Sequence, residues 1–183
     1  MDSSALDMTG RQLNRRRLLM SLALSGVSLI VVATAADVDA RKGEKDKKKK
    51  KSKDKQKSSG DAQAVVKEAQ KYKGTKYVMG GESPRGFDCS GFTWYVYQKV
   101  TGMDIGRTVK AQWSEGNSIS QGSVNPGDIV FFKNTFEHGL SHCGISLGGN
   151  KFIHAENENT GVVISELDSD YYSDHYAGAR RIV

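Results

Sequence analysis

The chain has 183 residues and a formal net charge of +6, but one short segment carries the excess positive charge. Residues 41–57 hold ten lysines and one arginine against three acidic residues, whereas residues 58–183 hold twelve basic and fourteen acidic residues. The folded part is therefore slightly acidic, which argues against nucleic acid as a partner. Its length, roughly 125 residues, suits one domain with its own core.

The first 40 residues have the features of an export signal. A basic region spans Arg11 to Arg17, an apolar run follows from Leu18 to Ala36, and the run ends near the small-x-small pattern Ala33-Thr34-Ala35. We therefore predict that residues 1–40 are a signal peptide or an N-terminal anchor, since 19 apolar residues can just span a bilayer. The protein is expected to be exported to the periplasm, cell envelope or extracellular space, by a twin-arginine or a Sec signal.

Residues 41–60 are predicted to be a disordered, lysine-rich linker. Residues 41–57 contain no large apolar side chain, so this stretch cannot bury enough surface to fold. It is either a soluble spacer or an electrostatic contact to anionic wall polymers or a membrane surface.

A first helix is predicted to begin at Asp61 and to end before Gly74. One of its faces is apolar at helical spacing: Ala62, Val65, Val66, Ala69 and Tyr72.

A second helix is predicted to begin at Cys89, with Asp88 as its N-cap and Gly102 beyond its end. A thiol in the first turn of a helix feels the positive end of the helix dipole, which favours the thiolate. Cys89 is therefore a candidate nucleophile, although a lone cysteine is more often a small buried hydrophobe.

Further along the chain, the sequence predicts a short helix near Thr108–Glu115 and then a series of strands. The strands are expected at Ile129–Phe132, His142–Leu147, Lys151–Ala155, Gly161–Ser165 and Ala177–Val183. Helices followed by an antiparallel sheet indicate an α+β domain over residues 61–183.

Two histidines are candidates for the base and for the polar group that orients it. If Gly148-Gly149-Asn150 is a three-residue hairpin loop, Gly144 pairs with His154, and His142 lies diagonal to His154 on the same face. A two-residue loop would turn the two rings to opposite faces. His138 and His175 fit no such pattern and are interpreted as surface residues. No zinc-ligand spacing occurs, so no metal or organic cofactor is suggested.

Six sequence blocks, in this order, resemble the NlpC-type bacterial cell-wall cysteine endopeptidases, which have a papain-like core. The resemblance covers residues from about Val65 to Val183. The blocks are Gly74–Gly81, Gly86–Gly91, Arg107-Thr108 with Gln112, Asn125–Phe132, the two histidine strands, and Gly178–Val183.

The resemblance implies that Cys89 is the nucleophile, His142 the base and His154 the orienting residue. It also implies that the helix beginning at Cys89 packs on the antiparallel sheet. Met79 stands where the family usually has tryptophan, and Gly106 where proline is common, which affects the expected groove wall rather than the chemistry.

The expected function is that of a secreted, monomeric cysteine peptidase acting on peptidoglycan stem peptides. By resemblance, the bond cut lies between γ-D-glutamyl and a diamino acid. The Cys89 backbone N–H and the Tyr77 hydroxyl are candidates for the oxyanion site, with Tyr77 as a core aromatic the alternative. Asp88 and Ser90 are candidates for contact with a free amine of the stem, with Asp88 as a helix cap alone the alternative. Two alternatives stay open. One is an amidase or transpeptidase on the same scaffold, and the other is a non-catalytic polybasic envelope-binding protein.

Cys143 lies next to a candidate catalytic histidine and could be mistaken for a disulfide partner of Cys89. Because side chains alternate along a strand, we expect His142 to face Cys89 and Cys143 to point to the opposite face of the sheet. Cys143 is then a small buried hydrophobe, either in the core under Ile145 and Phe152 or against a neighbouring element, with no bridge to Cys89.

Overall fold

The structure, a computed structural model, describes residues 59–183. The predicted signal or anchor at residues 1–40 and the lysine-rich segment 41–57 lie outside the described residues. Within residues 59–183, no helix is long and apolar enough to cross a membrane.

The described residues form one mixed domain of helices and antiparallel strands. After a first helix at residues 59–70, the elements are β1 (Glu82–Ser83), β2 (Gly86–Phe87), α2 (Cys89–Thr101), α3 (Val109–Trp113), β3 (Asn117–Ile119), η1 (Gln121–Ser123), β4 (Ile129–Lys133), β5 (Leu140–Gly148), β6 (Lys151–Ala155), β7 (Val162–Glu166), α4 (Asp170–His175) and β8 (Tyr176–Arg181). Strands β1 and β2 pair in a small hairpin. The other six form one antiparallel sheet in the order β3-β8-β4-β5-β6-β7. The predicted α+β class is confirmed.

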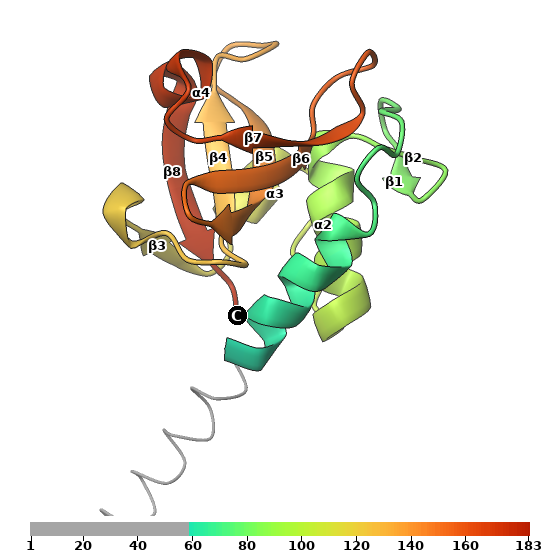
Figure 1. The fold of residues 1–183 in the computed structure, drawn as a ribbon, viewed down its shortest axis with the longest axis horizontal. Helices are drawn as coiled ribbons and strands as arrows, with labels where there is room; N and C mark the ends of the chain where they lie inside the picture. The colour runs from blue at the N-terminus through green and yellow to red at the C-terminus, as the bar shows by residue number, and fades with distance from the viewer. Residues whose placement is uncertain (1–58) are drawn as a thin grey trace, which may run out of the picture. The chain divides into compact units, whose positions relative to one another are not determined.

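The sheet is covered on both faces, and each face has its own apolar core. The first helix and α2 lie side by side on one face (Figure 1), where α2 packs on β5 and β6. Buried residues of this core include Val65, Ala69, Phe92 and Val96. On the opposite face, α4 packs on β4, and Tyr172 joins Phe132 and Phe152 in a smaller cluster. A residue on β5 therefore contacts one core or the other, according to its place in the strand alternation.

The predicted helices and strands are all present, with ends displaced by one to a few residues. The first helix already includes residues 59 and 60, so it begins before Asp61 and takes in two residues of the predicted linker. The hairpin β1–β2, strand β3, the turn η1 and helix α4 were not predicted. All are short: β3 has three residues, and α4 has six, too few to display a helical period.

The hairpin between β5 and β6 differs from the prediction in its turn. Gly148 pairs with Lys151, so the loop has two residues, Gly149 and Asn150, rather than three. Both have positive φ, 56° and 69°, as a type I′ turn requires.

The histidine register nevertheless agrees with the prediction, because a register shift follows the turn. Between Ser146 and Gly148 the pairing slips by one residue, and beyond this bulge Ile145 pairs with Ile153. The bulge thus contains the extra residue that the prediction assigned to the loop. His142 and His154 therefore share one face of the sheet.

Candidate active site

Helix α2 places Cys89 at its first position, against strand β5. Asp88 is the N-cap, and its carboxylate accepts a hydrogen bond from the Gly91 backbone N–H at 2.6 Å. The helix ends at Gly102 in the left-handed conformation, as predicted. Cys89 is 4% exposed, and its Sγ lies 4.0 Å from the carbonyl oxygen of Ser141 on β5. The Cys89 thiol therefore lies at the positive end of the α2 dipole and beside the first residues of β5.

Arg107 holds Asp88, the residue that directly precedes Cys89. Its Nη1 and Nη2 donate to the two carboxylate oxygens of Asp88 at 2.9 and 2.7 Å, a bidentate pair. The Gly80 backbone N–H also donates to Asp88, at 2.9 Å, and Arg107 Nη1 lies 3.2 Å from Ser90 Oγ. Asp88 thus caps α2 and links its own loop to the loops that carry Gly80 and Arg107. The sequence predicted that Asp88 is the N-cap but not that Arg107 pairs with it, although Arg107 belongs to one of the six sequence blocks that carry the family resemblance.

The imidazoles of His142 and His154 are in direct contact. Nε2 of His142 lies 2.7 Å from Nδ1 of His154, and Nε2 of His154 lies 3.0 Å from Ser165 Oγ. Burial, and the nearby charge of His142, hold the pKa of His154 well below its ordinary value, so His154 stays neutral. A neutral ring that donates to Ser165 accepts at Nδ1 from His142. This leaves Nδ1 of His142 for the Cys89 thiol.

Aromatic packing holds His154 in this orientation. Its ring stacks on Phe152 at 4.5 Å between centroids and meets Tyr172 edge-on at 5.3 Å. Gly144, opposite His154, leaves the room that this stack needs: a Cβ there would lie 2.8 Å from the Phe152 ring and 2.9 Å from the His154 Cβ. Ser165 and Tyr172 are supporting residues that sequence reasoning missed, because the register of β7 and the existence of α4 were not known.

Cys143 is buried and unbridged, as predicted, but it lies on the other face of the sheet from the one predicted. Both cysteines are free. Cys143 points toward α2, with its Sγ 3.7 Å from Thr93 Oγ1 and 3.6 Å from Gln112 Oε1. His142 instead shares the opposite face with Phe132 and His154. The predicted alternation of side chains along β5 was right. The Cys89 thiol, however, lies so close to the β5 backbone at Ser141 that both His142 and Cys143, from opposite faces of the strand, can interact with it.

The surroundings of Cys89 favour its thiolate. A hydrogen bond from the Cys143 thiol, followed by the hydrogen bond and charge of His142, holds the pKa of Cys89 well below its ordinary value despite burial. Burial, and then the neighbouring Cys89 thiolate, raise the pKa of Cys143 well above its ordinary value. Cys143 therefore remains a neutral donor, while Cys89 carries the negative charge.

Removing the Cys143 donor should raise the pKa of Cys89. In Cys143→Val, the rate of Cys89 alkylation and the acid limb of the pH–rate profile should move to higher pH, while activity at the plateau is largely kept. Cys143→Ser keeps a donor and is the matched control. An alkylation profile of Cys143→Val that overlays the wild-type profile would refute this role for the Cys143 thiol.

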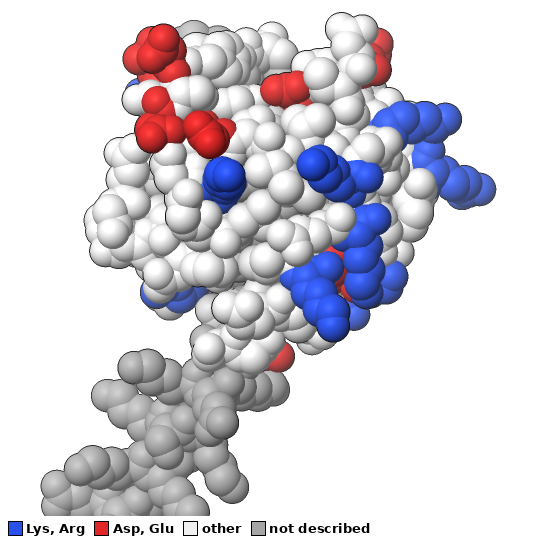
Figure 2. Space-filling view, in the orientation of Figure 1, with Lys and Arg blue, Asp and Glu red and all other residues white. Residues whose placement is uncertain are grey.

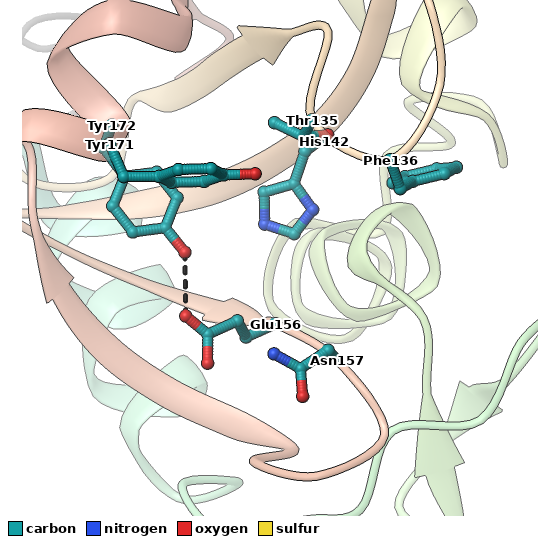
Figure 3. Close-up of a pocket in the computed structure, with 7 residues that line it drawn as sticks. All are labelled: Thr135, Phe136, His142, Glu156, Asn157, Tyr171 and Tyr172. Carbon is teal, nitrogen blue, oxygen red and sulfur yellow. Dashed lines mark hydrogen bonds between the residues drawn. The ribbon is translucent and has the colours of Figure 1, made fainter.

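Two cavities flank the cysteine and histidine. The thiol cavity, about 280 Å³, is lined by Cys89 and by Tyr77, Met79, Asp88, Ser90, Thr108, Val109, Lys110, Phe136, Glu137, Leu140 and Ser141. The histidine cavity, about 370 Å³, is lined by His142 and by Thr135, Phe136, Glu156, Asn157, Tyr171 and Tyr172 (Figure 3). Phe136, 60% exposed, is common to both. The two cavities give a substrate one place on each side of the reacting groups.

Met79 lines the thiol cavity, as expected for the groove wall, and so does Tyr77, whereas Gly106 and the remaining two histidines line neither cavity. Burial, with the nearby Cys89 thiolate and Asp88, raises the pKa of Tyr77 to about 12, so its hydroxyl remains a donor at neutral pH. Gly106 has φ +80°, a conformation that proline cannot adopt. His138 and His175 line neither cavity.

Comparison with known proteins agrees with this geometry. The model of the NlpC/P60 family matches residues 74–181. The chain is 43% identical over 118 residues to the "Gamma-DL-glutamyl hydrolase" of Bacillus subtilis, covering 64% of this chain and 28% of that protein. It is 48% identical over 118 residues to the "Probable peptidoglycan endopeptidase LytE" of the same organism, covering 64% and 33%. The match thus spans a third or less of these two relatives.

A solved structure extends the likeness to the fold. The NlpC/p60 domain of the peptidoglycan hydrolase SagA superposes with a TM-score of 0.58 at 41% identity, covering 65% of this chain and 97% of that one. The matched residues include both cavities, α2 and the two histidine strands. A family match over more than half the chain, together with a shared fold, establishes that this chain belongs to the NlpC/P60 family.

Proposed function

We propose that this protein is a cysteine endopeptidase that hydrolyses peptide bonds in peptidoglycan. The observation that carries the proposal is the alignment of a low-pKa thiol, Cys89, with two hydrogen-bonded imidazoles. Cys89 is the nucleophile, His142 the base, and His154 the residue that orients His142. A binding protein needs no such arrangement, which is why catalysis is the favoured function.

In this mechanism the Cys89 thiolate attacks the scissile carbonyl, and protonated His142 gives its proton to the leaving amine. Neutral His142 then takes a proton from the water that hydrolyses the acyl-enzyme. His154 accepts the His142 Nε2–H throughout, which keeps Nδ1 directed at the reacting atoms. Since His154 stays neutral, it holds the ring without withdrawing the proton from it.

The oxyanion of the tetrahedral intermediate is proposed to accept hydrogen bonds from the Cys89 backbone N–H and the Tyr77 hydroxyl. Tyr77 lines the same cavity as Cys89 and keeps its proton at neutral pH. Tyr77→Phe should lower kcat by about 10²-fold with little change in KM, because the lost donor acts on the transition state. An unchanged kcat would assign Tyr77 to packing alone.

The preferred bond is proposed to join γ-D-glutamate to a diamino acid. Support comes from the relatives, one a glutamyl hydrolase and one a peptidoglycan endopeptidase by name. Asp88 and Ser90 line the thiol cavity and are proposed to meet the free amine of the stem peptide. Because Arg107 already pairs with both Asp88 oxygens, this amine would be held by hydrogen bonds more than by net charge.

Mass spectrometry of purified peptidoglycan digested with the full chain tests the proposal. We expect fragments with a new γ-D-glutamyl carboxyl end and a new diamino-acid amino end. Cleavage between the sugar and the stem would instead show an amidase, and exchange of stem peptides without net hydrolysis would show a transpeptidase. Intact peptidoglycan that still sediments with the protein would support a non-catalytic envelope binder.

The N-terminal predictions remain proposals, because residues 1–58 lie outside the described part. We propose export by the signal at residues 1–40 and an electrostatic contact of residues 41–57 with anionic wall or lipid. Comparing envelope binding of the full chain and of a chain lacking 41–57, at low and high salt, separates this contact from a plain spacer.

A further inference from the structure

The histidine cavity has one formal charge besides its histidine, and that charge is negative. Among its lining residues, Glu156 is the only carboxylate, and no lysine or arginine is present. Figure 3 shows the Glu156 carboxylate and the His142 ring directed into the cavity, with the two tyrosines of α4 on one side and Phe136 on the other. A carboxylate between aromatic rings is a setting that suits a cation, by charge and by cation–π contact.

The Glu156 carboxylate is held in place but not neutralised by the described residues. Tyr172 OH donates to Oε1 at 2.9 Å, and Thr160 Oγ1 donates to Oε2 at 2.6 Å. A carboxylate has about four acceptor positions, so about two remain open. The five ion pairs among residues 59–183 do not include Glu156.

The wider surroundings of the cavity are also acidic. Residues 137–174 hold seven of the fourteen acidic residues in 58–183 and one lysine, Lys151. On the face drawn in Figure 2, acidic side chains gather at the end of the molecule where Figure 1 shows α4. A field of this sign attracts a cationic group to the histidine cavity and repels an additional carboxylate.

The reaction itself decides which part of the substrate enters this cavity. The acyl group becomes bonded to Cys89, which lines the thiol cavity, while the leaving amine takes its proton from His142, which lines the histidine cavity. The residue that leaves with that amine therefore extends into the histidine cavity. If the proposed function is right, this residue is the diamino acid.

We propose that the histidine cavity is a cation subsite in which Glu156 pairs with the side-chain ammonium of the leaving residue. The inference rests on the proposed function and adds a specificity to it. A free amine is a cation, whereas an amine acylated in a crosslink is neutral and bulkier. The enzyme then prefers stems whose diamino-acid side chain is not crosslinked.

Two synthetic peptides test the subsite: L-Ala-γ-D-Glu-L-Lys and the same peptide with its side-chain amine acetylated. With the full chain, acetylation should lower kcat/KM about tenfold, the size expected for losing one charge-assisted hydrogen bond. In Glu156→Gln the difference in kcat/KM between the two peptides should fall below about twofold. Glu166→Gln, an exposed acid on β7 that does not line the cavity, is the matched control and should retain the tenfold preference.

The ratio between the two peptides is the informative quantity, because Glu156 also contacts the histidine pair through Tyr172. Tyr172 OH lies 3.5 Å from His154 Nε2, so Glu156→Gln can lower kcat for every substrate alike. A uniform loss would leave the ratio at tenfold, which would overturn the cation subsite. An equal rate for both peptides in the wild-type protein would overturn it as well.

Binding to the full chain carrying Cys89→Ala separates the subsite from the proposed function. Acetylation should weaken calorimetric binding about tenfold in this variant, and less than twofold when Glu156→Gln is added. If the wild-type protein cuts neither peptide but this binding difference appears, the proposed bond specificity is wrong and the cation subsite stands. If both peptides are cut and bound equally well, the subsite is wrong and the proposed function stands.

Discussion

Cys89→Ala and His142→Ala are each expected to lower kcat by about four orders of magnitude or more. The nucleophile and its base act as one unit, so losing either removes nearly the whole chemical advantage. Alanine at position 89 leaves no atom to form the acyl-enzyme. Alanine at position 142 leaves a thiol without a proton acceptor and a leaving amine without a donor. Turnover of a soluble stem peptide by the full chain, followed by chromatography, measures both losses.

His138→Ala is the matched control for His142→Ala. His138 is exposed and lines neither cavity, so its removal should leave kcat within about twofold of wild type, as expected for a surface substitution. Comparable losses from His138→Ala and His142→Ala would contradict the assignment of the base. Activity of Cys89→Ala near the wild-type level would contradict the assignment of Cys89 as the nucleophile.

The parts of the fold that could be predicted are those with a strong local signal. Asp88 as a cap, Cys89 at a helix start and Gly102 at its end follow from capping chemistry, and the structure has all three. The pairing of the two histidine strands followed from their turn residues. It agreed with the structure because a bulge at Leu147 compensated for a loop that is one residue shorter than predicted.

The parts that could not be predicted depend on contacts between distant segments. Nothing local to Arg107 indicates that it pairs with Asp88, 19 residues away, or that Ser165 lies beside His154. The sheet face that Cys143 occupies depended on where α2 lies relative to β5. Strand alternation fixes the relation between neighbouring side chains but not which face meets the helix.

The histidine cavity illustrates the same limit on the substrate side. Glu156 comes from the loop after β6, Phe136 from the loop after β4, and Tyr171 from a helix too short to show a period. No motif joins these residues, so only the folded chain places a carboxylate beside His142. Short motifs thus indicated the catalytic chemistry, whereas the proposed specificity depends on loop and helix side chains that only the folded chain brings together.

His154→Ala is expected to lower kcat by roughly 10²-fold, while leaving measurable activity and a nearly unchanged KM. Without the acceptor at Nδ1 of His154, the His142 ring rotates away from the thiol and loses much of its general acid–base contribution. His154→Gln offers an amide oxygen as acceptor and should recover part of the loss. Ser165→Ala removes only the next hydrogen bond and should cost a few-fold at most.

The pH dependence separates an orienting role from a structural one. Because His154 is neutral in the folded protein, its removal takes no charge from His142 and should lower the plateau of the pH–rate profile without displacing the acid limb set by Cys89. Cys89 alkylation in His154→Ala should likewise keep its low-pH onset. If His154→Ala is as inactive as Cys89→Ala and His154→Gln restores nothing, His154 takes part in proton transfer itself rather than holding the base.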